Sequence, residues 1–238
     1  MNMGTVLVTG ASQGIELELV RQYACDQWSV IACCRSPERA TELLAIAGTN
    51  PSVSVEALDI TDHAAIDELV RRTGGKAIDV LINNAGLMGA LPFRENLHRQ
   101  HFGSVDYELW DEVFKTNTLG TVKMTEAFAD AVAASTQKKI VSLSSTTGSI
   151  TESKREALAY TTSKTALNKA MTVIAEQLRP RGIVVALVCP GYVKTRMNVG
   201  GATVEIPESV SGMRRLIAGF TLADSGTFRR YNGDTIAW

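Results

Sequence analysis

Tyr160 and Lys164 stand four positions apart in a helical stretch from about Ala157 to Leu178. Residues at this spacing lie on one face of a helix. A free tyrosine has a pKa of about 10, so its phenol is a poor base at neutral pH. A neighbouring ammonium favours the phenolate, which eases proton exchange with a substrate oxygen. The pair could therefore serve the reduction of a carbonyl group, although a surface pair would be the preferred interpretation if the motif stood alone.

A run of hydroxyl side chains, Ser144 to Thr147, follows an apolar stretch and precedes Gly148. A serine here could hydrogen-bond a substrate oxygen and stabilise the negative charge that develops on it. Serines at strand ends are also common, so Ser144 and Ser145 both stay open as candidates at this point. Asn117 is interpreted from the sequence alone as a polar residue of a helix or as a helix cap.

A glycine-rich turn, Thr9-Gly10-Ala11-Ser12-Gln13-Gly14-Ile15, lies between the first apolar run and the first helical stretch. Gly10 permits a tight turn, and Gly14 lets the main chain approach a pyrophosphate closely. The free N–H groups and the dipole of a helix start favour anionic phosphates. The turn predicts dinucleotide binding, although glycine also ends strands that bind nothing.

Short apolar runs that are rich in Val and Ile alternate with helical stretches, and most of the runs are unbroken. Strands that are buried on both faces of a parallel sheet have this pattern. The sequence therefore predicts a Rossmann-type, doubly wound α/β sheet in a single domain over residues 1–238. Val53-Ser54-Val55 alternates, which places its strand nearer an edge. The six runs are Val6–Val8, Val30–Cys34, Val53–Leu58, Val80–Ile82, Ile140–Leu143 and Ile183–Val188.

Two segments do not fit this alternation, Leu87 to Asp106 and Tyr192 to about Ile217. Long irregular segments in compact domains are often binding loops. We expect them to form the walls of an apolar substrate pocket, although their side chains could equally be ordinary packing. The candidate wall residues are Met88, Leu91, Phe93, Tyr192 and Met197.

Four motifs together resemble the short-chain dehydrogenase/reductase family. They occur along essentially the whole chain in the order and spacing of that family: the Thr-Gly-x-x-x-Gly-Ile turn, Asn83-Asn84-Ala85-Gly86, Tyr160-x-x-x-Lys164 and Pro190-Gly191. Val193-Lys194-Thr195 and the chain end through Trp238 resemble its C-factor and carbonyl-reductase-like branch. The resemblance implies an oxidoreductase that moves a hydride between a nicotinamide dinucleotide and a carbonyl or alcohol.

The resemblance also implies roles for individual residues. Tyr160 would be the general acid/base, Lys164 would hold the nicotinamide ribose, and the main chain of Asn117 would help to hold a proton-relay water. By its position relative to Gly148, Ser145 would be the catalytic serine, and Ser144 is the competing assignment. The cofactor-binding residues would be Gly10, Ser12, Gln13, Gly14, Ile15, Arg35, Asp59, Ile60, Asn84, Ala85, Gly86, Tyr160, Lys164, Pro190, Gly191, Val193 and Thr195.

The end of the second predicted strand bears on the choice of dinucleotide. An NAD-binding protein usually carries an acidic residue there for the ribose 2′-hydroxyl. This chain has Cys33-Cys34-Arg35-Ser36 instead. Arg35 could pair with a 2′-phosphate, so we expect NADP rather than NAD, although it could also be an ordinary surface arginine. Asp59 matches the family position beside the adenine ring and could equally cap the next helix.

One residue departs from the family pattern, because Glu16 stands where a third glycine is usual. That glycine allows close packing of helix, strand and cofactor. The side chain of Glu16 is expected to turn outward to water, and the alternative is that it weakens cofactor binding or abolishes activity. Replacing Glu16 by glycine is expected to tighten dinucleotide binding, because bulk and charge are removed together.

The remaining features exclude several classes of protein. The net charge of -1 gives no basic footprint for nucleic acid, and no apolar run is long enough to span a bilayer. No CxxC pair suggests a metal site, and His98 and His101 lack a third ligand, so no metal is expected. We expect reduced, mostly buried cysteines in a cytoplasmic protein that has no signal peptide.

Family relatives often form dimers through the two long helices around the fifth strand, so a homodimer acting on a small carbonyl or alcohol is expected. Two other functions stay open. One is a non-catalytic dinucleotide-binding signalling protein of C-factor type. The other is a relative that performs a different cofactor-dependent reaction, such as epimerisation or dehydration, since a fold does not determine a function.

Overall fold

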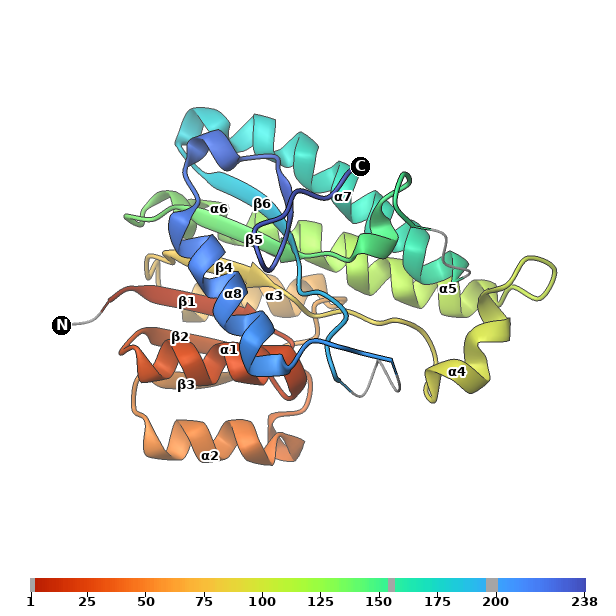
Figure 1. Cartoon of the computed structure of the whole chain (residues 1–238). Helices are drawn as coiled ribbons and strands as arrows, with labels where there is room; N and C mark the ends of the chain where they lie inside the picture. Colours follow the sequence, from red (N-terminus) through yellow and green to blue (C-terminus); the bar gives the residue numbers. More distant parts are fainter. Residues whose placement is uncertain (1–2, 154–156, 196–200) are drawn as a thin grey trace.

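The computed structural model describes residues 3–153, 157–195 and 201–238. In this described part, parallel strands form one seven-stranded sheet in the order β3-β2-β1-β4-β5-β6-β7 (Figure 1). The strands are β1 (Thr5–Thr9), β2 (Ser29–Cys34), β3 (Val53–Ala57), β4 (Val80–Asn83), β5 (Lys139–Leu143), β6 (Val184–Cys189) and β7 (Phe228–Arg230).

Helices connect the strands and cover both faces of the sheet. The α-helices are α1 (Gly14–Cys25), α2 (Thr41–Thr49), α3 (His63–Arg72), α4 (Phe93–Asn96), α5 (Tyr107–Phe114), α6 (Thr121–Ala133), α7 (Leu158–Leu178) and α8 (Ile206–Gly219). A π-helical turn, η3 (Lys115–Gly120), joins α5 to α6. Short 3-10 helices are η1 (Pro37–Arg39), η2 (Leu97–Gln100), η4 (Thr146–Gly148), η5 (Arg179–Arg181) and η6 (Leu222–Asp224).

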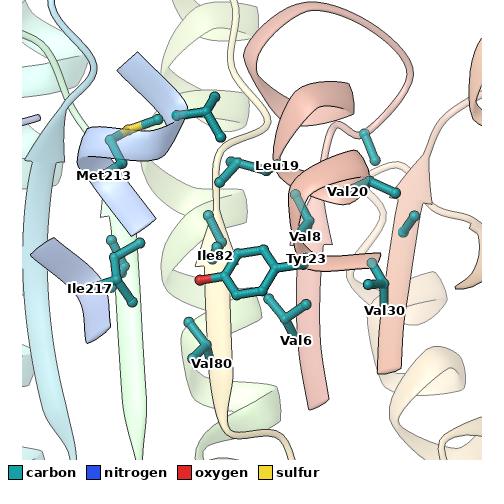
Figure 2. Packing of buried hydrophobic residues seen from close by; sticks show 14 of the residues in the cluster. Val6, Val8, Leu19, Val20, Tyr23, Val30, Val80, Ile82, Met213 and Ile217 are labelled. Atoms are coloured by element: carbon teal, nitrogen blue, oxygen red, sulfur yellow. The ribbon is translucent and has the colours of Figure 1, made fainter. Parts of the chain in front are cut away.

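Alternate residues of the strands face two separate hydrophobic clusters. Val6 and Val8 of β1 belong to the cluster under α1, α2 and α8, whereas Leu7 belongs to the cluster under α3, α6 and α7. Figure 2 shows the ring of Tyr23 from α1 within the first cluster. Burial on both faces explains why the strand sequences are unbroken apolar runs.

The order of the strands places two loops side by side. After β1 the chain builds β2 and β3 on one side, and then returns to place β4 on the other side of β1. Ligands of doubly wound sheets bind outside the carboxyl ends of the strands at such a reversal. A Cβ atom on Gly10, after β1, would lie 3.0 Å from the Cα atom of Ala85, after β4.

The six apolar runs correspond to β1–β6, and β3 is an edge strand as its alternation predicts. β7 was not predicted, because its sequence Phe-Arg-Arg has a single apolar residue. The second irregular segment ends earlier than predicted, because α8 begins at Ile206. Within the described residues, no helix combines the length and apolar character that crossing a membrane requires.

Candidate active site

Tyr160 and Lys164 lie in the first two turns of α7. The Lys164 Nζ atom is 6.0 Å from the centroid of the Tyr160 ring. It donates a hydrogen bond of 2.9 Å to the carbonyl oxygen of Leu143, the last residue of β5. This bond fixes the ammonium group at the strand end that leads directly into Ser144 and Ser145.

The side chain of Lys164 is buried and only 6% of the residue is exposed. Burial lowers the pKa of Lys164 to about 8, against the opposing effects of Cys189 and Glu16. A Cβ atom on Gly86 would lie 3.6 Å from Lys164 Nζ and 3.2 Å from Asn117 Oδ1. The loop after β4 therefore comes close to the lysine at a residue that has no side chain.

The two candidate serines differ in their hydrogen bonds. Ser144 is buried, and its hydroxyl donates to Oδ1 of Asn168 at 2.6 Å. Ser145 is half-buried, and its Oγ atom accepts from the N–H of Thr147 at 3.2 Å and from the Thr147 hydroxyl at 2.9 Å. These bonds use Ser145 only as an acceptor, so its hydroxyl hydrogen could be donated to a substrate oxygen. The geometry favours Ser145 over Ser144 for that role.

Asn117 is fully buried in the π-helical turn η3, inside the helix rather than at its cap. Its side chain accepts from the N–H of Leu87 and donates to the carbonyl oxygen of Leu87, both at 2.7 Å. It also donates to the hydroxyl of Ser163 at 2.9 Å. Single π-helical turns are frequent at functional sites. Here the turn holds the loop after β4 against α7, one turn from Tyr160.

The glycine-rich turn has the conformation that its sequence predicts. Gly10 and Gly14 have φ angles of +79° and +67°, in the left-handed region that favours glycine. The hydroxyl oxygen of Thr9 accepts from the N–H groups of Asn84 and Ala85 at 3.0 and 3.1 Å. The turn is thereby held against the loop after β4. Ser12, Gln13 and Ile15 adjoin the start of α1, where N–H groups favour an anion.

Glu16 does not turn outward to water, contrary to the preferred expectation from the sequence. Its carboxyl group is half-buried and accepts a hydrogen bond from the side-chain amide of Asn84. Burial raises the pKa of Glu16 to about 7, and hydrogen bonds from Asn84 and from its own N–H, together with the charge of Lys164, partly oppose this shift. The carboxyl group points into the predicted cofactor region because α1 presents its first turn to the loop after β4.

The residues predicted around the adenosine end lie at the carboxyl ends of β2 and β3. Arg35 is exposed and forms no salt bridge within the described part of the chain. Asp59 accepts from the N–H and the hydroxyl of Thr61 at 2.9 and 2.7 Å, whereas Asp62 caps α3. Asp59 thus orders the turn instead of capping the helix. It lines a pocket of about 670 Å³ with Thr61, Asp62, His63, Lys115 and Leu119.

Ile60 is buried against η3, since a Cβ atom on Gly120 would lie 2.7 Å from its carbonyl oxygen. The turn Pro190-Gly191 directly follows β6. Ser209 of α8 donates to the carbonyl oxygen of Pro190 at 2.6 Å, and Gly191 has a φ angle of +88°. Val193 is buried, and the N–H of Thr195 bonds its carbonyl oxygen at 2.9 Å.

Gln100 contacts the first turn of α7 and was not predicted from the sequence. It is buried, and its side-chain oxygen accepts from the N–H of Tyr160 at 3.1 Å. Its side-chain nitrogen donates to the carbonyl oxygen of Met88 at 2.9 Å. Helix starts leave N–H groups without partners. Ala157 at the N-cap has no polar side chain that could accept from these N–H groups. An acceptor from another segment of the chain is therefore needed.

The pocket beside the irregular segment 87–106 has more charged residues in its lining than the sequence predicted. A pocket of about 290 Å³ lies between this segment and α5, and its polar lining residues are Arg99, Asp106, Glu108 and Glu112. Leu91, an expected apolar wall, is 71% exposed. Met197 lies outside the described residues. The apolar substrate pocket therefore stays a prediction.

The structure also shows the environment of the candidate metal-binding side chains. His98 Nδ1 contacts the carbonyl oxygen of Glu95 at 2.9 Å. Over residues 3–153, 157–195 and 201–238, no group of three His, Cys, Asp or Glu side chains could hold a metal ion. All four cysteines are free, and three of them are buried, as predicted.

Comparison with known proteins identifies relatives of this chain. Residues 4–203 match the short chain dehydrogenase family. The chain is 36% identical to C-signal of Myxococcus xanthus over 162 residues, which cover 68% of this chain and 93% of that protein. Two solved structures match with a TM-score of 0.89 over 100% of both chains. They are an NADPH-bound carbonyl reductase from chicken fatty liver, at 30% identity, and the carbonyl reductase Sniffer of D. melanogaster, at 26% identity.

The match to the family covers more than half of the chain and includes the glycine-rich turn, Asn117, the hydroxyl run at the end of β5, and Tyr160 with Lys164. The C-signal match is more than 30% identical and covers most of that protein. The seven-stranded parallel sheet with helices on both faces agrees with the solved structures. The chain therefore belongs to the short-chain dehydrogenase family, whose members of known structure above include an NADPH-bound oxidoreductase.

Proposed function

We propose that this protein is an NADP(H)-dependent reductase that transfers a hydride between nicotinamide and a carbonyl or alcohol substrate. The observation that carries the proposal is the position of Lys164, whose ammonium group lies beside the Tyr160 ring and is fixed by Leu143. The glycine-rich turn supports dinucleotide binding, because Gly10 and Gly14 have left-handed φ angles beside the start of α1, where N–H groups favour an anion. The NADPH-bound carbonyl reductase at 30% identity also supports it.

The residues of the chain would divide the work as follows. The bound dinucleotide supplies or accepts the hydride. The hydroxyl group of Tyr160 gives its proton to the carbonyl oxygen in reduction and takes one from the alcohol in oxidation. The charge of Lys164 favours the phenolate that remains on Tyr160. Ser145 donates a hydrogen bond to the same substrate oxygen and stabilises its developing charge.

Lys164 and Asn117 have further roles in this proposal. A pKa of about 8 leaves Lys164 mostly protonated at neutral pH, as a group that stabilises a phenolate must be. It would also hold the hydroxyl groups of the nicotinamide ribose. Through its side-chain bonds to Leu87 and Ser163, Asn117 holds the loop after β4 against α7. The main chain of Asn117 would help to hold a relay water.

The preference for NADP rests on Arg35. The residue is exposed at the carboxyl end of β2 and has no carboxylate partner in the described residues. Its guanidinium group could form a charge-assisted fork with a 2′-phosphate. The neighbouring main-chain turn carries no acidic residue at the position that would bond a ribose 2′-hydroxyl. The remaining predicted contacts, from Ser12 to Thr195, would surround the dinucleotide at the carboxyl edge of the sheet.

The proposed activity is tested by the loss of NADPH absorbance with a panel of aldehydes, ketones and quinones. Turnover is expected with at least one of these classes, and Tyr160→Phe is expected to abolish it because the proton donor is lost. Tyr107→Phe is the matched control, since Tyr107 is 74% exposed on α5. Equal turnover of Tyr160→Phe and the parent protein would contradict the assignment of Tyr160.

A second candidate is a dinucleotide-binding signalling protein without catalytic activity. Two observations favour it: the inward carboxyl group of Glu16 and the similarity to C-signal. It predicts NADP(H) binding without turnover of any substrate in the panel. Turnover that depends on Tyr160 would exclude it.

We also infer a homodimer formed through α6 and α7, the long helices before and after β5. Its mass is measurable by light scattering on a sizing column. The four free cysteines support a reducing compartment such as the cytoplasm. A small carbonyl or alcohol substrate is the only other partner that the proposal requires, and neither nucleic acid nor membrane enters it.

A further inference from the structure

We propose that the Glu16 carboxyl group occupies the place at the start of α1 that the dinucleotide pyrophosphate needs, so that dinucleotide binding takes up a proton at Glu16. The inference rests on the proposed function, because it assumes that a dinucleotide binds at the glycine-rich turn. It goes further by making one residue of this chain responsible for the affinity and the pH dependence of that binding.

The first argument is the position of the carboxyl group. Glu16 is the third residue of α1, so its main-chain N–H belongs to the free donors of the first turn. The Glu16 side-chain oxygen Oε2 lies 3.3 Å from where a Cβ atom on Gly14 would stand. The carboxyl group therefore lies against the glycine whose bare main chain is expected to approach the pyrophosphate.

The second argument is that Glu16 uses donors that an anionic ligand would use. Its carboxylate accepts from the side-chain amide of Asn84 and from its own main-chain N–H. Asn84 belongs to the loop that is expected to contact the dinucleotide. The carboxylate of Glu16 thus occupies the place of an anionic ligand at this helix start, where negative charge is favoured.

The third argument concerns charge. A pyrophosphate that arrives beside an ionised Glu16 meets a like charge in a partly buried region, where screening by water is weak. A protonated Glu16 removes this repulsion and can itself donate a hydrogen bond to a phosphate oxygen. The bound state therefore favours the neutral carboxyl group, or a carboxylate that has moved away from Asn84.

The charged surroundings of Glu16 determine how this proton uptake is observed. Lys164 of α7 is the cation that acts on Glu16, and Cys189 of β6 acts in turn on Lys164. Asn84 and Thr9, from the two adjoining loops, are neutral. Lys164 has a pKa of about 8, and its loss of charge would also weaken anion binding at higher pH. The range between pH 6 and 7.5 separates the two groups, because Lys164 stays mostly protonated there.

The sign of the effect follows from the raised pKa of Glu16, which is about 7 in the free protein. Well below pH 7 the carboxyl group is neutral, and affinity is independent of its titration. Above pH 7 the fraction of protein that is ready to bind falls, and the apparent dissociation constant rises by up to about tenfold per pH unit. A stronger repulsion between the pyrophosphate and the ionised carboxylate makes the apparent dissociation constant continue to rise to higher pH.

The test measures NADP binding by titration calorimetry with the parent protein, Glu16→Gln, Glu16→Gly and the control Glu18→Gln. Glu18 lies on the same helix but pairs with Arg21 at 2.6 Å, away from Asn84. Measurement in two buffers with different ionisation enthalpies gives the number of protons taken up. Thermal melting first establishes that each variant is folded.

The parent protein and Glu18→Gln are expected to take up a fraction of a proton at pH 7.5 and to lose affinity from pH 6 to 7.5. Glu16→Gln and Glu16→Gly are expected to bind more tightly at pH 7.5, by about threefold or more, and with a flatter pH dependence. If Glu16→Gln and the parent protein have the same affinity and the same proton uptake, this inference is wrong while the proposed function stands. If none of the four proteins binds NADP or NADPH at any pH, both are wrong.

Discussion

The side-chain oxygen of Gln100 accepts a hydrogen bond from the main-chain N–H of Tyr160 at 3.1 Å, over 60 positions of sequence. Through its side-chain nitrogen Gln100 also holds the carbonyl oxygen of Met88. One buried amide therefore connects the irregular segment after β4 with the first turn of α7. We interpret Gln100 as a positioning residue for Tyr160.

Replacing Gln100 by methionine keeps the length of the side chain and removes both hydrogen bonds. The N–H of Tyr160 would lose its partner, at a cost of about 1–3 kcal/mol in the free energy of unfolding. A small displacement of Tyr160 is expected to lower kcat by about tenfold or more. Steady-state kinetics and thermal melting measure the two effects. The control is Gln177→Met, which makes the same replacement at an exposed position of α7. A lower Tm with unchanged kcat and KM would leave Gln100 a purely structural residue.

The two neighbouring serines are expected to respond differently to replacement by alanine. Ser145→Ala should lower kcat by about 10²–10³-fold with little change in Tm, because a donor to the substrate oxygen is lost. Ser144→Ala should lower Tm, because Oδ1 of Asn168 loses a buried donor at 2.6 Å, and should affect the rate less. The reverse pattern would transfer the catalytic role to Ser144.

Glu16 is expected to make the stability of the protein depend on pH even without a cofactor. Burial raises its pKa from 4.5 to about 7, so between these values the folded protein binds more protons than the unfolded chain. The contribution of Glu16 to stability is therefore largest below pH 4.5 and is lost as the pH rises to 7. Glu16→Gln should be more stable than the parent protein at pH 8 by on the order of 1–2 kcal/mol, or about 2–8 °C in Tm, with a smaller gain at pH 5. An equal gain at both values would mean that charge is not the cause.

Arg35 is expected to distinguish the two dinucleotides. Arg35→Ala removes the proposed partner of the 2′-phosphate and should raise the dissociation constant for NADPH by about 10–100-fold, which corresponds to about 1.4–2.8 kcal/mol. Affinity for NADH should be unchanged. Arg39→Ala is the control, because this exposed arginine lies nearby and faces Glu38 at 3.9 Å. A similar loss for both dinucleotides would show that Arg35 acts on another part of the ligand.

Much of the fold followed from local patterns in the sequence. Unbroken apolar runs such as Val30–Cys34 predicted β1–β6, because burial on both sheet faces removes the polar alternation. The helical stretch predicted from about Ala157 to Leu178 corresponds to α7, Leu158–Leu178. β7 left no comparable signal, because Phe228 is its only apolar residue and its pairing with β6 supplies the rest.

The candidate site was predictable where a residue acts through its neighbours in sequence, as Gly10 and Gly14 do. It was not predictable where the partner is distant. The contact of Gln100 with Tyr160 and the bond of Ser144 to Asn168 both depend on groups that only the fold brings together. The direction of Glu16 depends likewise on Asn84, which lies 68 positions away. Whether a charged side chain at a helix start faces water or a neighbouring loop is a tertiary question.

The turn after β6 draws its support from a part of the chain beyond residue 203, where the family match ends. Ser209 holds the carbonyl oxygen of Pro190, and the ring of Tyr231 lies 3.0 Å from where a Cβ atom on Gly191 would stand. The glycine-rich turn is held by residues within the family match, since Thr9 accepts from the N–H groups of Asn84 and Ala85. Substitutions near the end of the chain can thus shift one edge of the predicted dinucleotide site without replacing any residue that lines it.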